Sequence, residues 1–278
     1  MKSDDGSLRC EICPRHCVIR EGQYGFCRGR KNEGGKNVCA NYPYFTALAL
    51  DPIEKKPLRR FFPGTRILSA GTFGCNLTCP FCQNYTISQV SREEILPYCR
   101  ELSARELASL VLSRDDSIGI AFTYNEPLIS YDYIIETARL VRPHKKVVIV
   151  TNGCVTPQIM AAVLPFTDAM NIDLKGGEDF YREKLGGDYM TVLENIRMAA
   201  GSCHVEVTTL VIPGVNDSDD FIKEEASWLA GLSEDLPLHL SRYFPRYRCA
   251  IPATPPETIF HLQKLARNYL NYVYTGNV

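Results

Sequence analysis

The stretch GCNLTCPFCQN, Gly74 to Asn84, places three cysteines within eight residues, at Cys75, Cys79 and Cys82. A closed structural zinc site takes four ligands, and most iron–sulfur clusters are also held by four thiolates. Three thiolates suit a [4Fe–4S] cluster whose fourth iron stays open to bind a reactant. Zinc with a distant fourth ligand is the alternative, but the position of the loop directly after an expected strand favours the cluster.

Short apolar runs alternate with helical patterns from residue 67 onward, which predicts an α/β fold. Each connection is long enough for a right-handed parallel crossover, so the order predicts six β/α units. The expected strands are residues 67–75, 118–124, 146–153, 169–174, 204–212 and 236–243. The expected helices are residues 103–113, 127–141, 156–164, 190–200, 217–232 and 254–270.

Two architectures fit six β/α units, a doubly wound open sheet and a partial barrel of the TIM type. Polar residues follow nearly every expected strand, whereas a doubly wound sheet gathers them mainly at one switch point. The sequence therefore predicts a partial (β/α)6 TIM-like barrel that is open on one side. The polar positions are Cys75, Asn125, Glu126, Asn152, Asp173, Lys175, residues 213–217 and Arg242.

Composition changes once along the chain. Residues 1–62 are rich in Cys, Gly, Arg and Lys and are predicted to form an N-terminal cysteine-rich metal-binding segment and lead-in, whereas residues 63–278 form the partial barrel. So small a segment needs a metal to hold its shape. Structural zinc and an auxiliary [4Fe–4S] cluster both fit, and we favour zinc. The four ligands would come from the pattern Cys10-x2-Cys13-x3-Cys17-x9-Cys27.

The overall charge and the start of the chain exclude several classes of protein. The 278 residues include 31 Lys and Arg against 32 Asp and Glu, for a formal net charge of -1, which argues against a nucleic-acid partner. No apolar run is long enough to span a membrane, and the polar start MKSDDGSLRC does not resemble a secretory signal. Twelve cysteines in such a chain predict a reduced, cytoplasmic protein that binds metal.

Five cysteines lie outside the two clusters. We expect them to pack in the interior, and Cys154 is the one that we would test as facing a substrate, because it follows the strand-end motif TNG. They are Cys39, Cys99, Cys154, Cys203 and Cys249.

The cysteine loop and the motifs around it resemble the radical S-adenosylmethionine (SAM) superfamily. An aromatic residue, Phe81, precedes the last cysteine of the C-x3-C-x2-C pattern. The motifs are similar to the group around pyruvate formate-lyase-activating enzyme, and they look most like the radical SAM member of the AmmeMemoRadiSam system. They are CEICPRHC (10–17), DPIEKKPL (51–58), TYNEP (123–127), TNG (151–153), DLKG (173–176), VIPGVND (211–217) and RYFPRY (242–247).

The resemblance implies a mechanism in which SAM binds the open iron and is cleaved reductively to methionine and a 5′-deoxyadenosyl radical, which abstracts a hydrogen atom. It implies that Glu126 binds the SAM amino group and that Asp173 and Lys175 lie near the ribose and the carboxylate. Thr208 stands where activating enzymes carry an arginine, which leaves Lys175 a larger share of the carboxylate contact. The implied cofactor-binding residues are Phe81, Asn125, Glu126, Asn152, Asp173, Lys175 and His239.

Several of these positions also have a purely structural interpretation. TNG can be a plain turn, Asp173 and Lys175 a strand-end ion pair, and His239 a packed core residue. In that interpretation, contacts within the protein explain why these residues follow the strands, and no cofactor is needed.

The most consistent function is that of an oxidoreductase that generates a radical from SAM and uses it on an unidentified substrate, either a protein loop, as in glycyl-radical activation, or a small molecule. Such an enzyme needs an electron donor such as flavodoxin or ferredoxin. The alternative is an iron–sulfur module that transfers electrons or binds a partner without catalysis, and TYNEP, DLK and the three-cysteine loop argue against it because a carrier needs no open iron.

Overall fold

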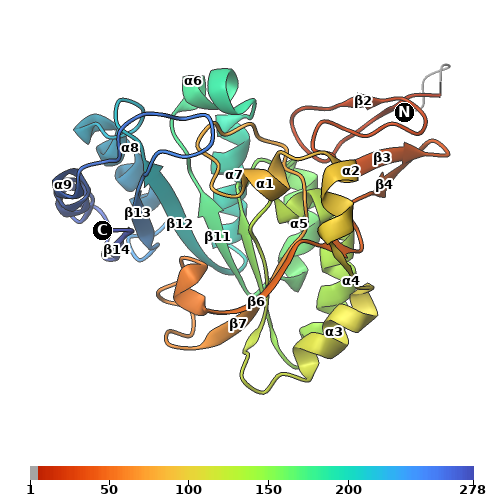
Figure 1. Ribbon diagram of the computed structural model, residues 1–278. Coiled ribbons are helices and arrows are strands. Elements are labelled where there is room, and N and C mark those ends of the chain that lie inside the picture. The colour runs from red at the N-terminus through yellow and green to blue at the C-terminus, as the bar shows by residue number, and fades with distance from the viewer. Residues whose placement is uncertain (1–5) are drawn as a thin grey trace.

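The structure is a computed structural model that describes residues 6–278 of the chain. Its main element is an eight-stranded sheet in the order β14-β13-β12-β11-β10-β9-β7-β6 (Figure 1). Neighbouring strands from β14 to β7 are parallel, and β6 is antiparallel to β7. The strands are β6 (Ala47–Pro52), β7 (Arg66–Gly71), β9 (Gly119–Phe122), β10 (Lys146–Thr151), β11 (Ala169–Asp173), β12 (His204–Val211), β13 (Leu238–Arg242) and β14 (Val273–Gly276).

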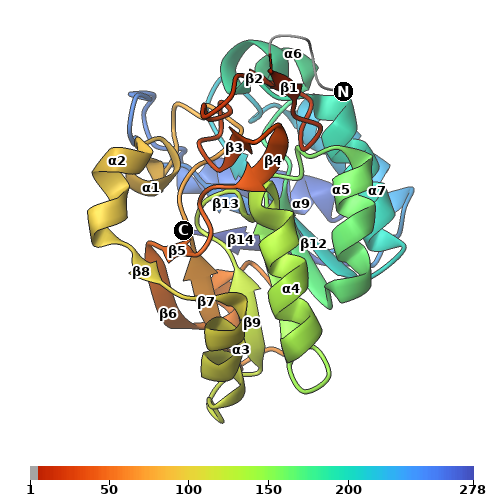
Figure 2. The same cartoon turned by 90° about the vertical axis from the view of Figure 1, so that its right-hand side faces the viewer.

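Helices connect the parallel strands and cover one face of the curved sheet, as the two views show (Figure 1 and Figure 2). None of the helices within residues 6–278 combines the length and the apolarity of a membrane span. The helices are α1 (Tyr85–Ser88), α2 (Arg92–Ile95), α3 (Ala104–Leu112), α4 (Tyr131–Val141), α5 (Pro157–Val163), α6 (Glu178–Phe180), α7 (Tyr189–Ala200), α8 (Asp219–Ala230) and α9 (Pro256–Ala266). Shorter 3-10 turns cover residues 53–55, 96–98, 127–130 and 164–166, and a π-turn covers Tyr181–Leu185.

The predicted architecture is confirmed: all six expected strands are present, in a sheet whose two edges, β6 and β14, leave the partial barrel open. In β10, Val147, Val148 and Ile149 are fully buried, as expected for a parallel strand that is covered on both faces. The expected helices are present with ends shifted by a few residues. Residues 127–141 divide into a 3-10 turn that begins at Pro127 and the helix α4.

Two strands of the sheet were not predicted. β14 extends the parallel sheet beyond β13, and β6 pairs with β7 over six residue pairs from Ala47–Gly71 to Pro52–Arg66. Four residues carry too short a pattern for β14 to stand out in the sequence. β6 comes from the predicted segment 1–62, so the lead-in contributes directly to the main sheet.

The N-terminal cysteines lie among two short hairpins, β1 (Leu8–Arg9) with β2 (Val18–Ile19) and β3 (Arg30–Glu33) with β4 (Lys36–Cys39). These hairpins lie beside α4 and α5 (Figure 2). The buried guanidinium of Arg30 donates to Asp132 of α4 at 2.9 Å, which fixes the second hairpin to the barrel. A further small pairing joins β5 (Tyr44–Phe45) to β8 (Arg100–Glu101).

Helix α3 begins with a capping box that the sequence pattern at Ser103 and Glu106 indicates. The backbone N–H of Glu106 donates to the Ser103 hydroxyl at 3.2 Å, and the Glu106 carboxylate accepts from the Ser103 backbone N–H at 2.8 Å. Two backbone donors that have no partner within the helix are thereby satisfied.

We predict that Ser103→Ala lowers the free energy of unfolding by about 1 kcal/mol, because the cap to the Glu106 backbone is lost. Ser109→Ala is the matched control, since Ser109 is exposed within the same helix and alanine favours helix. Urea unfolding of the anaerobic protein followed by circular dichroism measures both changes. Equal stability of the two variants would contradict a contribution from the cap.

Candidate functional site

A cavity of about 630 Å³ lies at the carboxyl ends of the strands. The residues that the sequence assigns to a cluster and a cofactor come from the loop after β7, from the ends of β9, β10 and β11 and from β13, and the structure brings all ten of them to this one cavity. They are Cys75, Cys79, Phe81, Cys82, Asn125, Glu126, Asn152, Asp173, Lys175 and His239.

The loop that carries the three cysteines is held by a side chain from the next strand end. Asn125 Nδ2 donates to the carbonyls of Phe73 at 3.2 Å and Gly74 at 3.1 Å, and its Oδ1 accepts from the Thr72 N–H at 3.1 Å. Asn125 was predicted to bind a cofactor, but both ends of its amide bind the backbone of the loop. Its side chain therefore shapes the loop at the edge of the cavity.

Gly74 marks the point where the loop approaches the N-terminal segment. Its φ is +88°, and a Cβ there would lie 2.2 Å from the carbonyl oxygen of Cys27. No other residue type fits this close approach without a shift of the backbone. The three-cysteine loop is thus packed directly against the four-cysteine segment.

The three thiols of the loop share the cavity wall, and no other cysteine of residues 6–278 lines it. Burial raises the pKa of Cys79 to about 11 and that of Cys75 well above its usual value, with a smaller effect from Glu126 on Cys75. The Cys75 sulfur accepts from the Leu77 N–H at 3.4 Å, and the sulfur of Cys82 lies 3.1 Å from the Ser88 hydroxyl. Thiols in such a setting become thiolates when a metal binds them.

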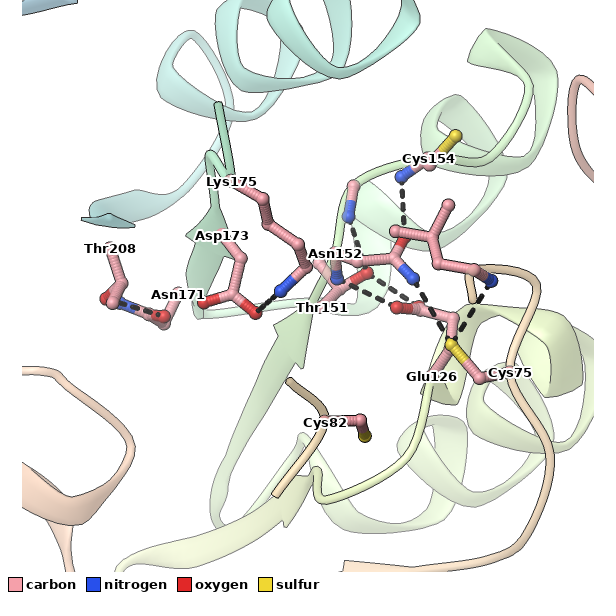
Figure 3. Close-up of polar contacts among 12 residues, drawn as sticks. Cys75, Cys82, Glu126, Thr151, Asn152, Cys154, Asn171, Asp173, Lys175 and Thr208 are labelled. Carbon is pink, nitrogen blue, oxygen red and sulfur yellow. Dashed lines mark hydrogen bonds and ion pairs between the residues drawn. The ribbon is translucent and has the colours of Figure 1, made fainter. Parts of the chain in front are cut away.

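Glu126 is a buried carboxylate at the start of the 3-10 turn 127–130 (Figure 3). Its Oε1 accepts from the Thr151 hydroxyl at 2.6 Å and the Leu128 N–H at 3.0 Å, and its Oε2 accepts from the Asn152 N–H at 2.8 Å. Burial raises the pKa of Glu126 to about 7, against the effect of these hydrogen bonds. The carboxylate is therefore held rigidly and still has lone pairs free toward the cavity.

Asn152 connects Glu126 to the cysteine loop. Its Nδ2 lies 3.6 Å from the sulfur of Cys75 and donates to Asn76 Oδ1 at 2.9 Å, while its Oδ1 accepts from the Cys154 N–H at 2.8 Å. The TNG sequence is thus more than a plain turn, because its asparagine contacts a cysteine of the cluster loop. Asn76, which we did not single out from sequence, is buried at the centre of these contacts.

Asp173 and Lys175 form an ion pair at 2.8 Å on the opposite wall (Figure 3). Burial opposes the positive charge of Lys175, but the nearby Asp173, Cys79 and Tyr181 outweigh that effect and raise its pKa. The Tyr181 hydroxyl donates to the Asp173 carbonyl at 3.3 Å and accepts from the Lys175 N–H at 3.1 Å. The cavity therefore has a carboxylate at one wall and a fixed ammonium at another.

The aromatic residue of the cysteine loop is packed rather than free. The ring of Phe81 stacks on Phe180 of α6 with centroids 6.1 Å apart and an angle of 8° between planes. Phe81 is buried and lines the cavity at the same time. It therefore ties the cysteine loop to the segment that follows β11.

His239 is part of a buried polar network at the far side of the cavity. Its Nε2 lies 2.6 Å from Glu206, whose carboxylate also contacts His204 at 2.9 Å and accepts from the backbone N–H groups of Arg59 and Arg60. Burial would raise the pKa of Glu206, but these partners lower it to about 2. The imidazole of His239 is oriented by this carboxylate and presents its remaining surface to the cavity.

Thr208, which stands where an arginine was expected from the resemblance, is paired with Asn171. The Thr208 hydroxyl lies 2.8 Å from the Asn171 amide nitrogen and 3.0 Å from its oxygen. Both residues are buried, and Thr208 lines the cavity. The cationic side chains on the cavity wall are those of Lys55, Lys56, Arg59 and Lys175.

Sequence reasoning missed a second network, built from the motif DPIEKKPL. The buried Lys56 donates to Asp51 at 2.8 Å, and the Tyr124 hydroxyl donates to the same carboxylate at 2.6 Å. The pKa of Asp51 lies well below its usual value, because the hydrogen bonds from Lys56 and Tyr124 outweigh burial. Tyr124 has a φ of +76°, an unusual backbone for a bulky residue, and it lines the cavity. The sequence motif 51–58 was noticed, but its pairing with Tyr124 could not be inferred without knowing that these two segments meet in the fold.

Cys154 does not face the cavity. It is buried, and its sulfur accepts from the Asp188 N–H at 3.4 Å on the far side of the TNG turn (Figure 3). The expectation that it faces a substrate is therefore wrong. That expectation rested only on the position of Cys154 after a strand. The chain turns at Gly153, which has a φ of +67°, and this turn directs Cys154 away from the cavity.

The sulfur atoms of the two cysteine sets are not arranged around a single ion. Within residues 6–278, no group of three or more His, Cys, Asp or Glu side chains could hold one metal ion. Both the loop cysteines and the N-terminal cysteines are among these residues.

Comparison with known proteins identifies the family. A family model described as the radical SAM superfamily matches residues 70–224, which is more than half of the chain. The chain belongs to the radical SAM superfamily. This radical SAM protein therefore comes from a family of enzymes that use a [4Fe–4S] cluster and SAM, and its three loop thiols around one cavity fit that cluster.

Individual relatives agree with the family. An uncharacterized protein of Methanocaldococcus jannaschii is 41% identical over 288 residues, which cover 100% of this chain and 83% of that protein. A radical SAM methyltransferase from Sphaerobacter thermophilus shares the fold with a TM-score of 0.59 at 19% identity, over 77% of this chain and 67% of that one. A domain of pyruvate-formate lyase-activating enzyme from Bacteroides vulgatus gives a TM-score of 0.51 at 20% identity, over 57% of this chain and 99% of that domain. At these identities the two structures show a shared fold.

We predict that Lys56→Met lowers the free energy of unfolding by about 3 kcal/mol, because it leaves the buried Asp51 carboxylate without its main cation. The double variant Asp51→Asn/Lys56→Met removes both charges and should recover much of the loss. Urea unfolding under anaerobic conditions measures all three proteins. If Lys56→Met lowers the free energy of unfolding by less than ~0.5 kcal/mol, the ion pair of Asp51 and Lys56 does not stabilise this part of the cavity wall.

Proposed function

We propose that this protein binds a [4Fe–4S] cluster through Cys75, Cys79 and Cys82 and binds SAM in the adjoining cavity. When bound, the two groups together supply a 5′-deoxyadenosyl radical, and the substrate loses a hydrogen atom to it. The observation that carries the proposal is the set of three thiols on the wall of one cavity, to which residues 6–278 add no fourth. A non-catalytic carrier would have no use for the charged groups opposite these thiols.

The charges on the cavity walls support a zwitterionic ligand such as the methionine end of SAM. Glu126 offers a carboxylate for an ammonium group, and Lys175 offers an ammonium for a carboxylate. Charge-assisted hydrogen bonds of this kind are stronger than neutral ones. The loop thiols line the same cavity as both charged groups, so a ligand held by both charges would share the cavity with the cluster.

The remaining residues position these groups. Asn125 fixes the cysteine loop, Asn152 fixes the contact between Cys75 and Glu126, and His239 lies on the part of the cavity that is left for ribose, adenine or substrate. Buried, fully bonded side chains of this kind hold a site in one geometry.

The open edge of the sheet offers a substrate a route to the cavity. The sheet ends at β14 on one side, and residues 275–277 beside this edge line the cavity. We propose that a protein loop reaches the site by this open edge, as in the activation of a glycyl radical enzyme. Incubation with fractionated, deuterium-labelled cell extract tests this idea, because deuterium in 5′-deoxyadenosine identifies the fraction that holds the hydrogen donor. Label that comes only from fractions of small molecules would contradict a protein substrate.

We predict that the anaerobic protein converts SAM to 5′-deoxyadenosine and methionine in the presence of a strong reductant or reduced flavodoxin. Cys79→Ala should form no 5′-deoxyadenosine above background, because two thiols cannot hold the cluster in place. Chromatography of the quenched reaction gives both products. If the wild-type protein forms no more product than Cys79→Ala, the non-catalytic carrier is the better account.

We predict that SAM binding weakens as the pH falls below about 7. The folded-state pKa of Glu126 is raised to about 7, so the carboxylate becomes neutral below that pH and can no longer pair with an ammonium group. The loss should approach a limit of about tenfold in affinity per pH unit. Calorimetric titration of the cluster-loaded protein between pH 6 and pH 8 measures it.

Glu126→Gln is the control for this pH dependence, since the amide keeps the shape of the side chain and cannot titrate. Its affinity for SAM should be weak and nearly independent of pH over the same range. An equally steep pH dependence in Glu126→Gln would assign the effect to another group.

A further inference from the structure

Arg59 is the one cationic side chain of the cavity wall that has no anionic partner within the part of the chain that the structure describes. Lys55 and Lys56 lie 3.5 Å and 2.8 Å from the Asp51 carboxylate, and Lys175 belongs to the ion pair described above. The Arg59 guanidinium has neither an ion pair nor a hydrogen bond there, although Arg59 lines the cavity. A guanidinium in this position is free to bind an anionic ligand through two parallel hydrogen bonds.

The main chain of Arg59 is fixed beside His239 by one buried carboxylate. Oε2 of Glu206 accepts from the Arg59 N–H at 2.9 Å and lies 2.6 Å from His239 Nε2. Its Oε1 accepts from the Arg60 N–H at 2.7 Å and lies 2.9 Å from His204 Nε2. The Glu206 side chain has no exposed surface, so these four contacts take the place of water. Arg59 and His239 are therefore held next to each other through a shared oxygen atom.

His239 keeps one ring nitrogen for the cavity. Glu206 is ionised and can only accept, so Nε2 of His239 carries the proton of their hydrogen bond. The ring of Tyr274 stacks on the imidazole with centroids 5.3 Å apart and an angle of 28° between planes. Nδ1 has no hydrogen bond in the described chain and is not one of its enclosed polar atoms that lack a partner. Nδ1 is therefore accessible, on a residue that lines the cavity.

The two groups come from opposite sides of the opening in the barrel. Arg59 follows β6, which forms one edge of the sheet, and His239 belongs to β13, the neighbour of β14 at the other edge. Glu206 of β12 joins the two segments. Asn277, just beyond β14, and Lys55, whose side chain is 68% exposed, line the same cavity. A substrate that enters by the open edge would therefore meet Arg59 and His239 on this side.

We propose that Arg59 and His239 form a subsite that binds a carboxylate of the substrate, and that Glu206 positions both residues. The inference rests on the proposed function, in which a protein loop enters by the open edge, and it specifies that loop as one with an acidic side chain. The guanidinium binds the carboxylate through charge-assisted hydrogen bonds. Nδ1 of His239 donates a further hydrogen bond, for which the ring must carry a proton on both nitrogens. The Glu206 carboxylate stabilises that charged ring through its contact with Nε2.

Two matched peptides test the subsite without SAM or reductant. Acetyl-Gly-Glu-Gly-amide and acetyl-Gly-Gln-Gly-amide have nearly the same shape and differ in one negative charge. Each is titrated into the full-length protein, purified without oxygen and with nitrogen-15 in its histidines, and nuclear magnetic resonance follows the imidazole nitrogens. The acidic peptide should move the Nδ1 resonance of His239 to that of a protonated ring, and the neutral peptide should not. The same response to both peptides, or none to either, would overturn the proposal.

Arg59→Gln should weaken binding of the acidic peptide about tenfold, because a hydrogen-bonded contact between two charged groups is lost. Arg60→Gln is the matched control, since the Arg60 side chain lies over the ring of Tyr272 at 3.9 Å and does not line the cavity. Both variants keep their backbone bonds to Glu206, and Arg60→Gln should bind the peptide as tightly as the wild type. Equal losses in the two variants would indicate a general effect of surface charge and overturn the subsite, as would an unchanged affinity in Arg59→Gln.

Glu206 acts through His239, so its test reads the state of that ring. In the peptide-free wild type at mildly alkaline pH, the neutral ring should carry its proton on Nε2. Glu206→Gln should give a mixture of both tautomers and bind the acidic peptide more weakly. His239→Gln identifies the resonances and provides a second test, since it leaves the buried carboxylate in place and should also weaken binding of the acidic peptide. An unchanged tautomer in Glu206→Gln, or wild-type affinity in His239→Gln, would contradict the proposal.

These outcomes separate the inference from the proposed function. Selective binding of the acidic peptide by a protein that forms no 5′-deoxyadenosine from SAM would contradict the proposed function and leave the subsite in place. Formation of 5′-deoxyadenosine by a protein that does not distinguish the two peptides would do the reverse.

Discussion

The candidate site depends on how the cysteine loop, residues 74–84, is held at the carboxyl ends of the parallel strands. A loop with three thiols in eight residues binds metal usefully only if its backbone is fixed, because nothing else sets the directions of the sulfurs. Asn125, after β9, bonds to three backbone groups of the loop. Asn76, within the loop, is bonded to Asn152 and Cys154, which follow β10. The parallel strands bring these amides together because their carboxyl ends share one edge of the sheet.

Two oppositely charged side chains lie near that loop in a largely buried setting. The carboxylate of Glu126 and the ammonium of Lys175 lie on different walls, and each is held by partners that leave it facing the cavity. Their pKa values are both raised, in Glu126 mainly by burial and in Lys175 by Asp173 and other neighbours, which outweigh burial. The result is a polar site with opposite charges at fixed positions, which suits a small zwitterion better than an apolar ligand.

The sequence predicts the parts of this arrangement that are local. Apolar runs located six of the seven parallel strands. The polar residues predicted after the first four of those runs line one cavity, whereas residues 213–217 and Arg242 do not line it. It does not predict what those side chains bond to. Asn125 lines the cavity and also bonds to the backbone of the cysteine loop, and Cys154 turns away. The pair of Asp51 and Lys56 depends on an antiparallel strand, β6, that the pattern did not reveal. Contacts between distant segments decide these details, and no local pattern records them.

The central claim is that one iron of the loop cluster has no protein ligand and binds SAM directly. Electron–nuclear double resonance of the reduced protein with SAM labelled with nitrogen-15 in the amino group or oxygen-17 in the carboxylate tests this contact. We predict a hyperfine coupling from each labelled atom to the cluster, absent in Cys79→Ala. A cluster spectrum that SAM leaves unchanged, with no coupling to either label, would contradict the account.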